Sequence, residues 1–174
     1  AWVAREPRAF GPVAMDSRLC YTPVPPLGRG HSSEESGANS MIRALVSGAF
    51  GRMGRYVIEA VDAAKDFELV GAVDPAGVGH GVAEILGEPS DLQISGHLAG
   101  TLEDTKPDVM VDFTVPAVVL DNIEAALTRR VPCVVGTTGL SDTDFEVVRA
   151  MCERNETACF IAPNFSIGAN LMMR

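Results

Sequence analysis

The chain has 174 residues, of which 47% are hydrophobic and 21% are charged, as in an ordinary globular protein. This length is enough for one domain with its core but short for a two-domain dehydrogenase. The net charge of −9 argues against a nucleic-acid partner, and no apolar run is long enough to cross a membrane.

Residues 1–40 contain five prolines and no sustained hydrophobic period. Such a segment cannot bury enough apolar surface to offset its ordering entropy, so we predict that it is disordered. Met41 opens the first predicted strand. Our preferred interpretation is that Met41 is the natural start and that residues 1–40 are an upstream or non-native extension. A genuine flexible arm is the alternative, and the acidic residues in this segment count against a transit peptide.

Residues 42–55 are the most informative stretch: a short apolar strand, three glycines spaced by two residues, and the start of a helix. Gly48 suits the tight turn out of the strand, Gly51 lets a phosphate approach the backbone, and Gly54 allows close helix packing. The free N–H groups at the start of the helix then face the anion. The spacing predicts a pyrophosphate site, although an ordinary glycine-rich turn has the same pattern.

An acidic residue at the end of the next strand strengthens this interpretation. The strand covers residues 67–74 and closes on Asp74, about 20 residues beyond the glycines, where a carboxylate accepts hydrogen bonds from the adenosine ribose. The intervening helix is predicted to bury one face, made of Met53, Val57, Val61 and Ala64.

Beyond residue 105, predicted strands and helices alternate at regular intervals. Such alternation predicts an α/β fold with a parallel, doubly wound, Rossmann-like sheet. Residues 75–105 look irregular, apart from a short helix at 82–86. The remaining predicted elements are strands at 109–113, 132–135 and 158–161, a helix from Pro116 to about residue 130, and a helix that Ser141 caps and that runs through Asn155.

Three of the predicted strand ends carry small hydroxyl, amide and glycine residues. They are residues 113–116, 136–139 and 162–166. The carboxyl ends of parallel strands meet at one edge, so these loops suit an extended polar ligand, although each taken singly is also a plausible turn.

The four cysteines show no C-x-x-C pair and no metal-ligand spacing, so no metal site is predicted. Cys133 and Cys159 lie in apolar strand-like runs, where small buried thiols are expected. This pattern favours a reducing compartment.

Taken together, the loops resemble those of the dihydrodipicolinate reductase family, also named 4-hydroxy-tetrahydrodipicolinate reductases, over residues 41–174. The resemblance rests on four motifs, of which the last is the most specific. They are Gly48–Gly54, Asp112–Thr114 with Pro116, Gly136–Gly139, and Ala162–Asn170.

The resemblance implies a cytoplasmic oxidoreductase that uses NADH or NADPH to reduce 4-hydroxy-tetrahydrodipicolinate to tetrahydrodipicolinate in lysine and diaminopimelate biosynthesis. It also implies a small cyclic dicarboxylate as substrate and a homotetramer for the full-length protein, with no nucleic-acid or membrane partner. The implied cofactor residues are Gly48, Ala49, Phe50, Gly51, Arg52 and Met53 at the pyrophosphate, Asp74 at the ribose, Phe113, Gly136, Thr137 and Thr138 along the nicotinamide, and Ala162, Pro163, Asn164 and Phe165 closing that end.

The family's catalytic elements, a histidine-rich E-x-H-H segment, a lysine and an S-G-T segment, have no match in this sequence. The resemblance therefore implies a cofactor domain at residues 41–165, a hinge at 166–174, a missing substrate domain and no activity of this fragment alone. No catalytic residue is assigned, because the resemblance places the expected histidine and lysine beyond Arg174. Two alternatives stay open, namely a non-catalytic nucleotide-sensing module and another amino-acid-pathway dehydrogenase.

Overall fold

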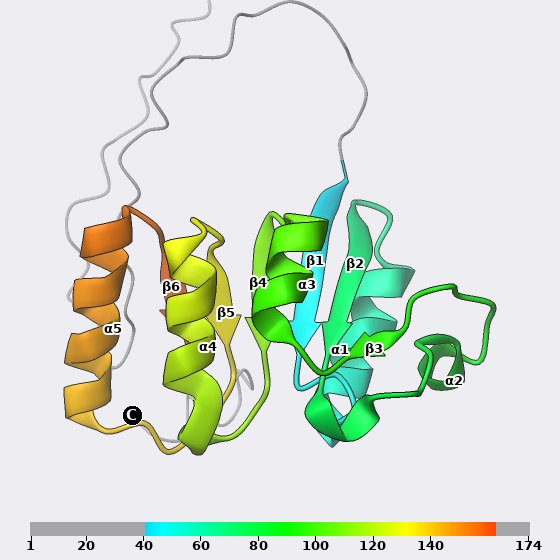
Figure 1. The fold of residues 1–174 in the computed structure, drawn as a ribbon, viewed down its shortest axis with the longest axis horizontal. Coiled ribbons are helices and arrows are strands. Elements are labelled where there is room, and N and C mark those ends of the chain that lie inside the picture. Colours follow the sequence, from blue (N-terminus) through cyan, green and yellow to red (C-terminus); the bar gives the residue numbers. More distant parts are fainter. Residues whose placement is uncertain (1–40, 163–174) are drawn as a thin grey trace, which may run out of the picture.

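The computed structural model describes residues 41–162, which form one six-stranded sheet with helices on both faces (Figure 1). The strand order is β3-β2-β1-β4-β5-β6, and every paired strand in it is parallel. This order confirms the predicted doubly wound, Rossmann-like α/β fold. The predictions for residues 1–40 and for residues 163–174, including the hinge up to Arg174, lie outside the described residues.

Outside residues 87–105, the strands and helices follow the predicted alternation along the chain. The strands are β1 (Ile42–Ser47), β2 (Phe67–Val73), β3 (Ile94–Ser95), β4 (Val109–Asp112), β5 (Cys133–Val135) and β6 (Cys159–Ile161). The helices are α1 (Arg52–Ala63), α2 (Ala83–Leu86), α3 (Leu98–Thr105), α4 (Pro116–Thr128) and α5 (Asp142–Asn155), with a 3₁₀ turn, η1, at Pro75–Gly77.

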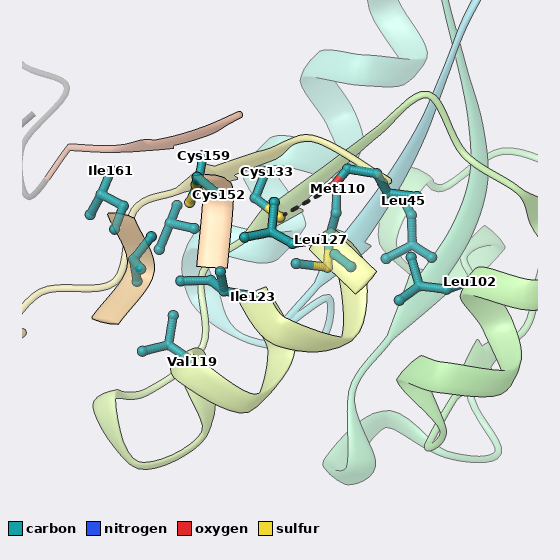
Figure 2. Packing of buried hydrophobic residues seen from close by; sticks show 14 of the residues in the cluster. Leu45, Leu102, Met110, Val119, Ile123, Leu127, Cys133, Cys152, Cys159 and Ile161 are labelled. Carbon is teal, nitrogen blue, oxygen red and sulfur yellow. Dashed lines mark hydrogen bonds between the residues drawn. The ribbon is translucent and has the colours of Figure 1, made fainter. Parts of the chain in front are cut away.

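Helices α3, α4 and α5 lie on one face of the sheet, and α1 lies on the other (Figure 1). Successive strand residues point to opposite faces, so β1 contributes to two separate cores. Leu45 packs in the larger core under α4 and α5, together with Met110 and Ile123 (Figure 2). Val46 packs in the smaller core with Ile58 of α1.

The buried face of α1 is rotated from the predicted one. Gly54, Ile58 and Val61 face the sheet, whereas Met53 is 46% exposed, so the prediction of Met53 as part of the buried face is wrong. The cause is local, because Gly54 rests against the carbonyl of Gly48 and this contact fixes which side of the helix turns inward.

The prediction that residues 75–105 are irregular is wrong in its second half. Ile94 pairs with Ala72 to start β3, and α3 follows directly. The short helix predicted at 82–86 is present as α2. Strand β3 has only two residues, and α3 contains Gly100 and begins without a side-chain cap. The sequence therefore shows neither the alternating run typical of a strand nor the capping residue typical of a helix start in this region.

Local signals later in the chain are confirmed. Pro116 opens α4, where its missing N–H and fixed φ do no harm. Ser141 caps α5 in a reciprocal capping box, since its hydroxyl accepts from the Asp144 N–H while the Asp144 carboxylate accepts from the Ser141 N–H at 2.7 Å.

Asp144→Ala should lower the free energy of unfolding at neutral pH and lose that effect in acid. Hydrogen bonds from the Ser141 N–H and hydroxyl hold the pKa of Asp144 below its ordinary value. The carboxylate therefore stabilises the fold above its unfolded pKa, and this stabilisation disappears as the pH falls through the folded pKa. Denaturant titrations from about pH 7 to about pH 3 should show the wild-type and variant midpoints converging. A gap of constant size would contradict this account.

The cysteines at 133, 152 and 159 are buried thiols, as expected for the two singled out from the sequence. A hydrogen bond with Cys133, together with burial, raises the pKa of the Cys159 thiol. Among residues 41–162, no group of three or more potential ligand side chains is placed to hold a metal ion. None of the helices in this part of the chain has the length and apolar character needed to span a membrane.

Candidate dinucleotide-binding site

A cavity of about 430 Å³ opens where the carboxyl ends of β1 and β4 meet. The strand order reverses here, because β2 lies on one side of β1 and β4 lies on the other. Ligands of open α/β sheets bind in the crevice at such a switch point. Four residues that the sequence predicted for the site line this cavity: Gly48, Gly51, Asp74 and Phe113.

The first and third glycines of the loop are required by its backbone. Gly48 has a φ of +79°, and a Cβ there would lie 2.6 Å from the carbonyl oxygen of Phe113. At Gly54 a Cβ would overlap the carbonyl of Gly48, which packs directly on α1. Glycine is therefore needed at these two positions for the loop to fold, whether or not the loop binds a ligand.

Gly51 differs from both of these glycines. Its backbone is extended, with φ −69° and ψ 164°, a conformation open to any residue. A Cβ there would meet one atom within 4 Å, the Gly48 carbonyl oxygen at 3.2 Å. A Cβ here therefore needs the Gly48 carbonyl to shift by only a few tenths of an ångström, far less than at Gly48 or Gly54, and the absent side chain leaves space on the cavity side.

The N-terminus of α1 has backbone donors available for an anion. The first helical hydrogen bond runs from the Arg55 N–H to the Gly51 carbonyl, and no side chain caps this end. The N–H groups of Arg52, Met53 and Gly54 precede that bond and therefore have no acceptor within the helix. No acidic side chain occupies the first turn, so the positive end of the helix dipole is uncompensated there.

Asp74 lies beside the loop in the wall of the same cavity and is hydrogen-bonded to the loop. Its Oδ2 accepts from the Phe50 N–H at 3.0 Å, and its Oδ1 accepts from the Ala76 N–H at 2.9 Å. Each carboxylate oxygen has further acceptor capacity. One side chain therefore orders the glycine loop and also presents a carboxylate in the cavity wall.

The tip of the loop is held by a stack that the sequence analysis did not anticipate. The Phe50 ring stacks on His80 with a centroid separation of 4.8 Å, and the Arg55 guanidinium lies 4.3 Å from the Phe50 centroid. The Arg55 Nε also donates to the Phe50 carbonyl at 3.1 Å. The His80 Nδ1 lies 2.8 Å from the Glu84 Oε2, and this hydrogen bond lowers the pKa of Glu84.

Two other loop residues predicted for the cofactor site make contacts within the fold. The Ala49 side chain is buried in the smaller core, and its N–H donates to the Val73 carbonyl. The Phe50 ring is in the stack just described. Arg52 and Met53 are exposed at the start of α1.

A buried cluster of polar side chains, here called the Asp112 cluster, lies under the ends of β1, β4 and β5. The Asp112 Oδ1 accepts from the Thr114 N–H at 3.0 Å, the Thr114 hydroxyl at 2.7 Å and the Thr137 hydroxyl at 3.2 Å. Its Oδ2 accepts from the Asn122 amide at 2.9 Å, and that amide also lies 3.3 Å from the Ser47 hydroxyl. The sequence hinted at this cluster only through a carboxylate that ends an apolar strand.

The residues predicted along the nicotinamide lie on the β4 and β5 ends, next to this cluster. Gly136 donates to the Asp112 carbonyl and faces the Phe113 ring, which a Cβ at position 136 would overlap. Thr137 and Thr138 line a second cavity of about 250 Å³. Ala162 is buried at the end of β6. Pro163, Asn164 and Phe165 lie outside the described residues.

No catalytic residue is predicted from the sequence. Arg174 lies outside the described residues. The two histidines of the described part, His80 and His97, lie on the β2 and β3 side of the sheet, away from the β4 and β5 ends. Neither is among the residues that line the two cavities.

Residues 42–165 match the family described as "Dihydrodipicolinate reductase, N-terminus". The chain belongs to the dihydrodipicolinate reductase family. It is thus homologous to NAD(P)H-dependent reductases and corresponds to their N-terminal, NAD(P)H-binding domain.

Individual dihydrodipicolinate reductases support this assignment. The 4-hydroxy-tetrahydrodipicolinate reductase of Desulfitobacterium hafniense is 44% identical over 135 residues, or 76% of this chain and 51% of that protein. The one from Synechocystis sp. is 42% identical over 141 residues, or 77% of this chain and 51% of that protein. A solved dipicolinate-bound dihydrodipicolinate reductase from Paenisporosarcina sp. TG-14 has 33% identity and a TM-score of 0.64, over 76% of this chain and 51% of that one. The chain thus spans about half the length of these relatives.

Proposed function

We propose that this chain is the cofactor-binding half of a reductase and binds NADH or NADPH in the crevice between β1 and β4. The observation that carries the proposal is one cavity lined both by Gly51, at the uncapped N-terminus of α1, and by the strand-end carboxylate of Asp74. The helix end suits a pyrophosphate, and the carboxylate suits ribose hydroxyls. Both ends of an adenosine diphosphate unit thus have chemically matched groups.

Each part of the site has a separate task in this proposal. The N–H groups at the start of α1 bind the pyrophosphate, and the open position at Gly51 lets it approach. Asp74 accepts from the adenosine ribose. Phe113, Gly136, Thr137 and Thr138 orient the nicotinamide half, and Ala162 to Phe165 close that end. The bound nicotinamide supplies a hydride, while the protein positions it.

The substrate and assembly are proposed from the relatives. A relative that binds dipicolinate is consistent with a cyclic dicarboxylate as substrate, which we take to be 4-hydroxy-tetrahydrodipicolinate in lysine and diaminopimelate biosynthesis. We propose a homotetramer for the full-length enzyme. The three buried thiols support a reducing, cytoplasmic location.

Cofactor choice follows from the charge at Asp74. The wild-type chain should bind NADH about tenfold more tightly than NADPH, because a 2′-phosphate beside a carboxylate is repelled by about 1 kcal/mol or more. Arg52, exposed at the start of α1, offsets this in part. Calorimetric titration of both cofactors into wild type and Asp74→Ala should show the ratio moving toward NADPH.

A second variant separates charge from loop support at this position. Asp74→Ala also removes the acceptor of the Phe50 N–H, whereas Asp74→Asn keeps an oxygen there and removes only the charge. The two variants should shift the ratio alike, with Asp74→Asn retaining more affinity overall. A wild-type preference for NADPH, or an unchanged ratio in both variants, would remove Asp74 from the assigned role.

Catalysis should need the other half of the relatives. The 174-residue chain should bind NADH yet fail to oxidise it with 4-hydroxy-tetrahydrodipicolinate, since reduction also needs a held substrate and a proton donor. A chimera in which residues 41–165 replace the matching half of the Desulfitobacterium hafniense reductase should oxidise NADH with that substrate. NADH absorbance measures turnover, and light scattering measures the oligomeric state. Turnover by the chain alone, a tetramer of the chain alone, or a folded chimera without activity would contradict the proposal.

A further inference from the structure

The Asp112 carboxylate is placed in an unusual way for a residue that only stabilises the fold. It is 0% exposed, and its four hydrogen-bond donors are all neutral N–H or O–H groups. Burying a carboxylate is costly, and an apolar residue of similar size would end the strand without that cost. A buried ionisable group with this many partners therefore points to a need for fixed geometry.

The donors show which parts of the molecule Asp112 holds. Thr114 belongs to the loop after β4 and Thr137 to the loop after β5, while Asn122 lies in the second turn of α4. Thr114 lines the 430 Å³ cavity and Thr137 lines the 250 Å³ cavity. A single carboxylate thus joins the walls of two adjacent cavities.

The adenosine side of the site has hydrogen bonds of its own that do not involve this carboxylate. Asp74 is held by the Phe50 and Ala76 N–H groups, and the glycine loop hydrogen-bonds to the end of β2. None of the hydrogen bonds that the structure gives Asp112 reaches either feature. Asp112 therefore supports the adenosine side only indirectly, through Asn122, whose amide also lies 3.3 Å from the hydroxyl of Ser47, the residue before Gly48.

We propose that Asp112 is a positioning residue that fixes the β4 and β5 loops in the shape required by the nicotinamide half of the dinucleotide. The proposal rests on the function proposed above. It makes a prediction that general stabilisation does not make: loss of Asp112 weakens binding of the whole dinucleotide but spares ligands that lack the nicotinamide.

The test compares NADH with ADP-ribose, which keeps the pyrophosphate and adenosine but has no nicotinamide. In calorimetric titrations of the full 174-residue chain, Asp112→Ala should lower NADH affinity by about tenfold or more, because three loop donors lose their acceptor. Its ADP-ribose affinity should stay within about twofold of wild type. Asp108→Ala is the matched control, since Asp108 precedes the opposite end of β4 and its carboxylate accepts from the Arg43 N–H.

A swap keeps the test valid if Asp112→Ala does not fold. Asp112→Asn alone pairs only if Asn122 turns its amide oxygen toward it and gives up its present bonds, whereas Asp112→Asn with Asn122→Asp restores a donor–acceptor pair directly. The swap should return the ratio of NADH to ADP-ribose affinity to within about threefold of wild type. Circular dichroism checks folding of each variant.

Several results would overturn the proposal. The first is a folded Asp112→Ala chain that loses NADH and ADP-ribose affinity equally or loses neither. The second is a selective loss of NADH affinity in Asp108→Ala. The third is a folded swap variant whose ratio of NADH to ADP-ribose affinity stays as low as in Asp112→Ala. A wild-type chain that binds neither ligand would overturn the proposed function as well. A wild-type chain that binds ADP-ribose but not NADH would support the adenosine site and contradict the roles proposed for the residues along the nicotinamide.

Discussion

Gly54→Ala should cost the chain about 3 kcal/mol or more of its free energy of unfolding, a large share of the total for a domain of this size. The added methyl group would overlap the carbonyl of Gly48, and it would also lie 2.9 Å from the Cα of Ala49. Both neighbours are backbone atoms in a loop that is hydrogen-bonded to β2, so no side chain can move aside. The loop and α1 would have to separate.

The chain offers a matched control for this substitution. Gly100 lies inside α3, and a Cβ there would meet no atom within 4 Å. Gly100→Ala should therefore raise the free energy of unfolding by about 0.5–1 kcal/mol, the usual helix preference for alanine. Chemical denaturation of both variants checks the pair. A Gly54→Ala chain as stable as Gly100→Ala would show that the helix does not pack on the loop as described.

Gly51→Val should abolish dinucleotide binding, with at least about a hundredfold loss of affinity, while the fold survives. The backbone at Gly51 is extended, a conformation that a branched residue adopts readily. The atom nearest to the added Cβ would be the Gly48 carbonyl oxygen, at 3.2 Å. The side chain would instead occupy the cavity beside the free N–H groups of α1. Those are the groups proposed to bind the pyrophosphate.

Thermal melting beside calorimetric titration of NADH separates binding from stability at this position. Gly51→Val should unfold within about 1 kcal/mol of wild type, in contrast to Gly54→Ala. The intermediate variant Gly51→Ala should show a smaller loss of affinity in the same direction. Wild-type affinity in a folded Gly51→Val chain would remove the glycine loop from the site.

The elements that could be predicted from the sequence are those with strong local patterns. α5 is defined by its Ser141 cap, α4 by Pro116, and β4 to β6 by short apolar runs. β3 and α3 could not be predicted, because β3 exists only through its pairing with β2 and α3 only through its packing on the sheet. Tertiary contacts decide such weak segments.

The same division applies to the candidate site. The glycine loop and Asp74 follow from spacing alone, because a tight βα turn and a strand-end carboxylate are local features. The Asp112 cluster joins Ser47 to Asn122 and Asp112 to Thr137, residues far apart in the chain that only the strand order brings together. The contact of Phe50 with His80 is likewise a product of the fold. The side of α1 that faces the sheet depends on the packing of Gly54 against the Gly48 carbonyl, and hydrophobic periodicity does not reveal that contact.

The central claim is that a dinucleotide binds along the carboxyl ends of the strands, from Asp74 to the β5 loop. Titration of the ¹⁵N-labelled 174-residue chain with NADH, followed by amide chemical shifts, tests this most directly. We predict shifts concentrated at residues 48–54, at Asp74, at Phe113 and at residues 136–138, with ADP-ribose reproducing only the first two sets. An unchanged spectrum, or shifts concentrated at the opposite edge of the sheet around Ile42 and Asp108, would contradict the account.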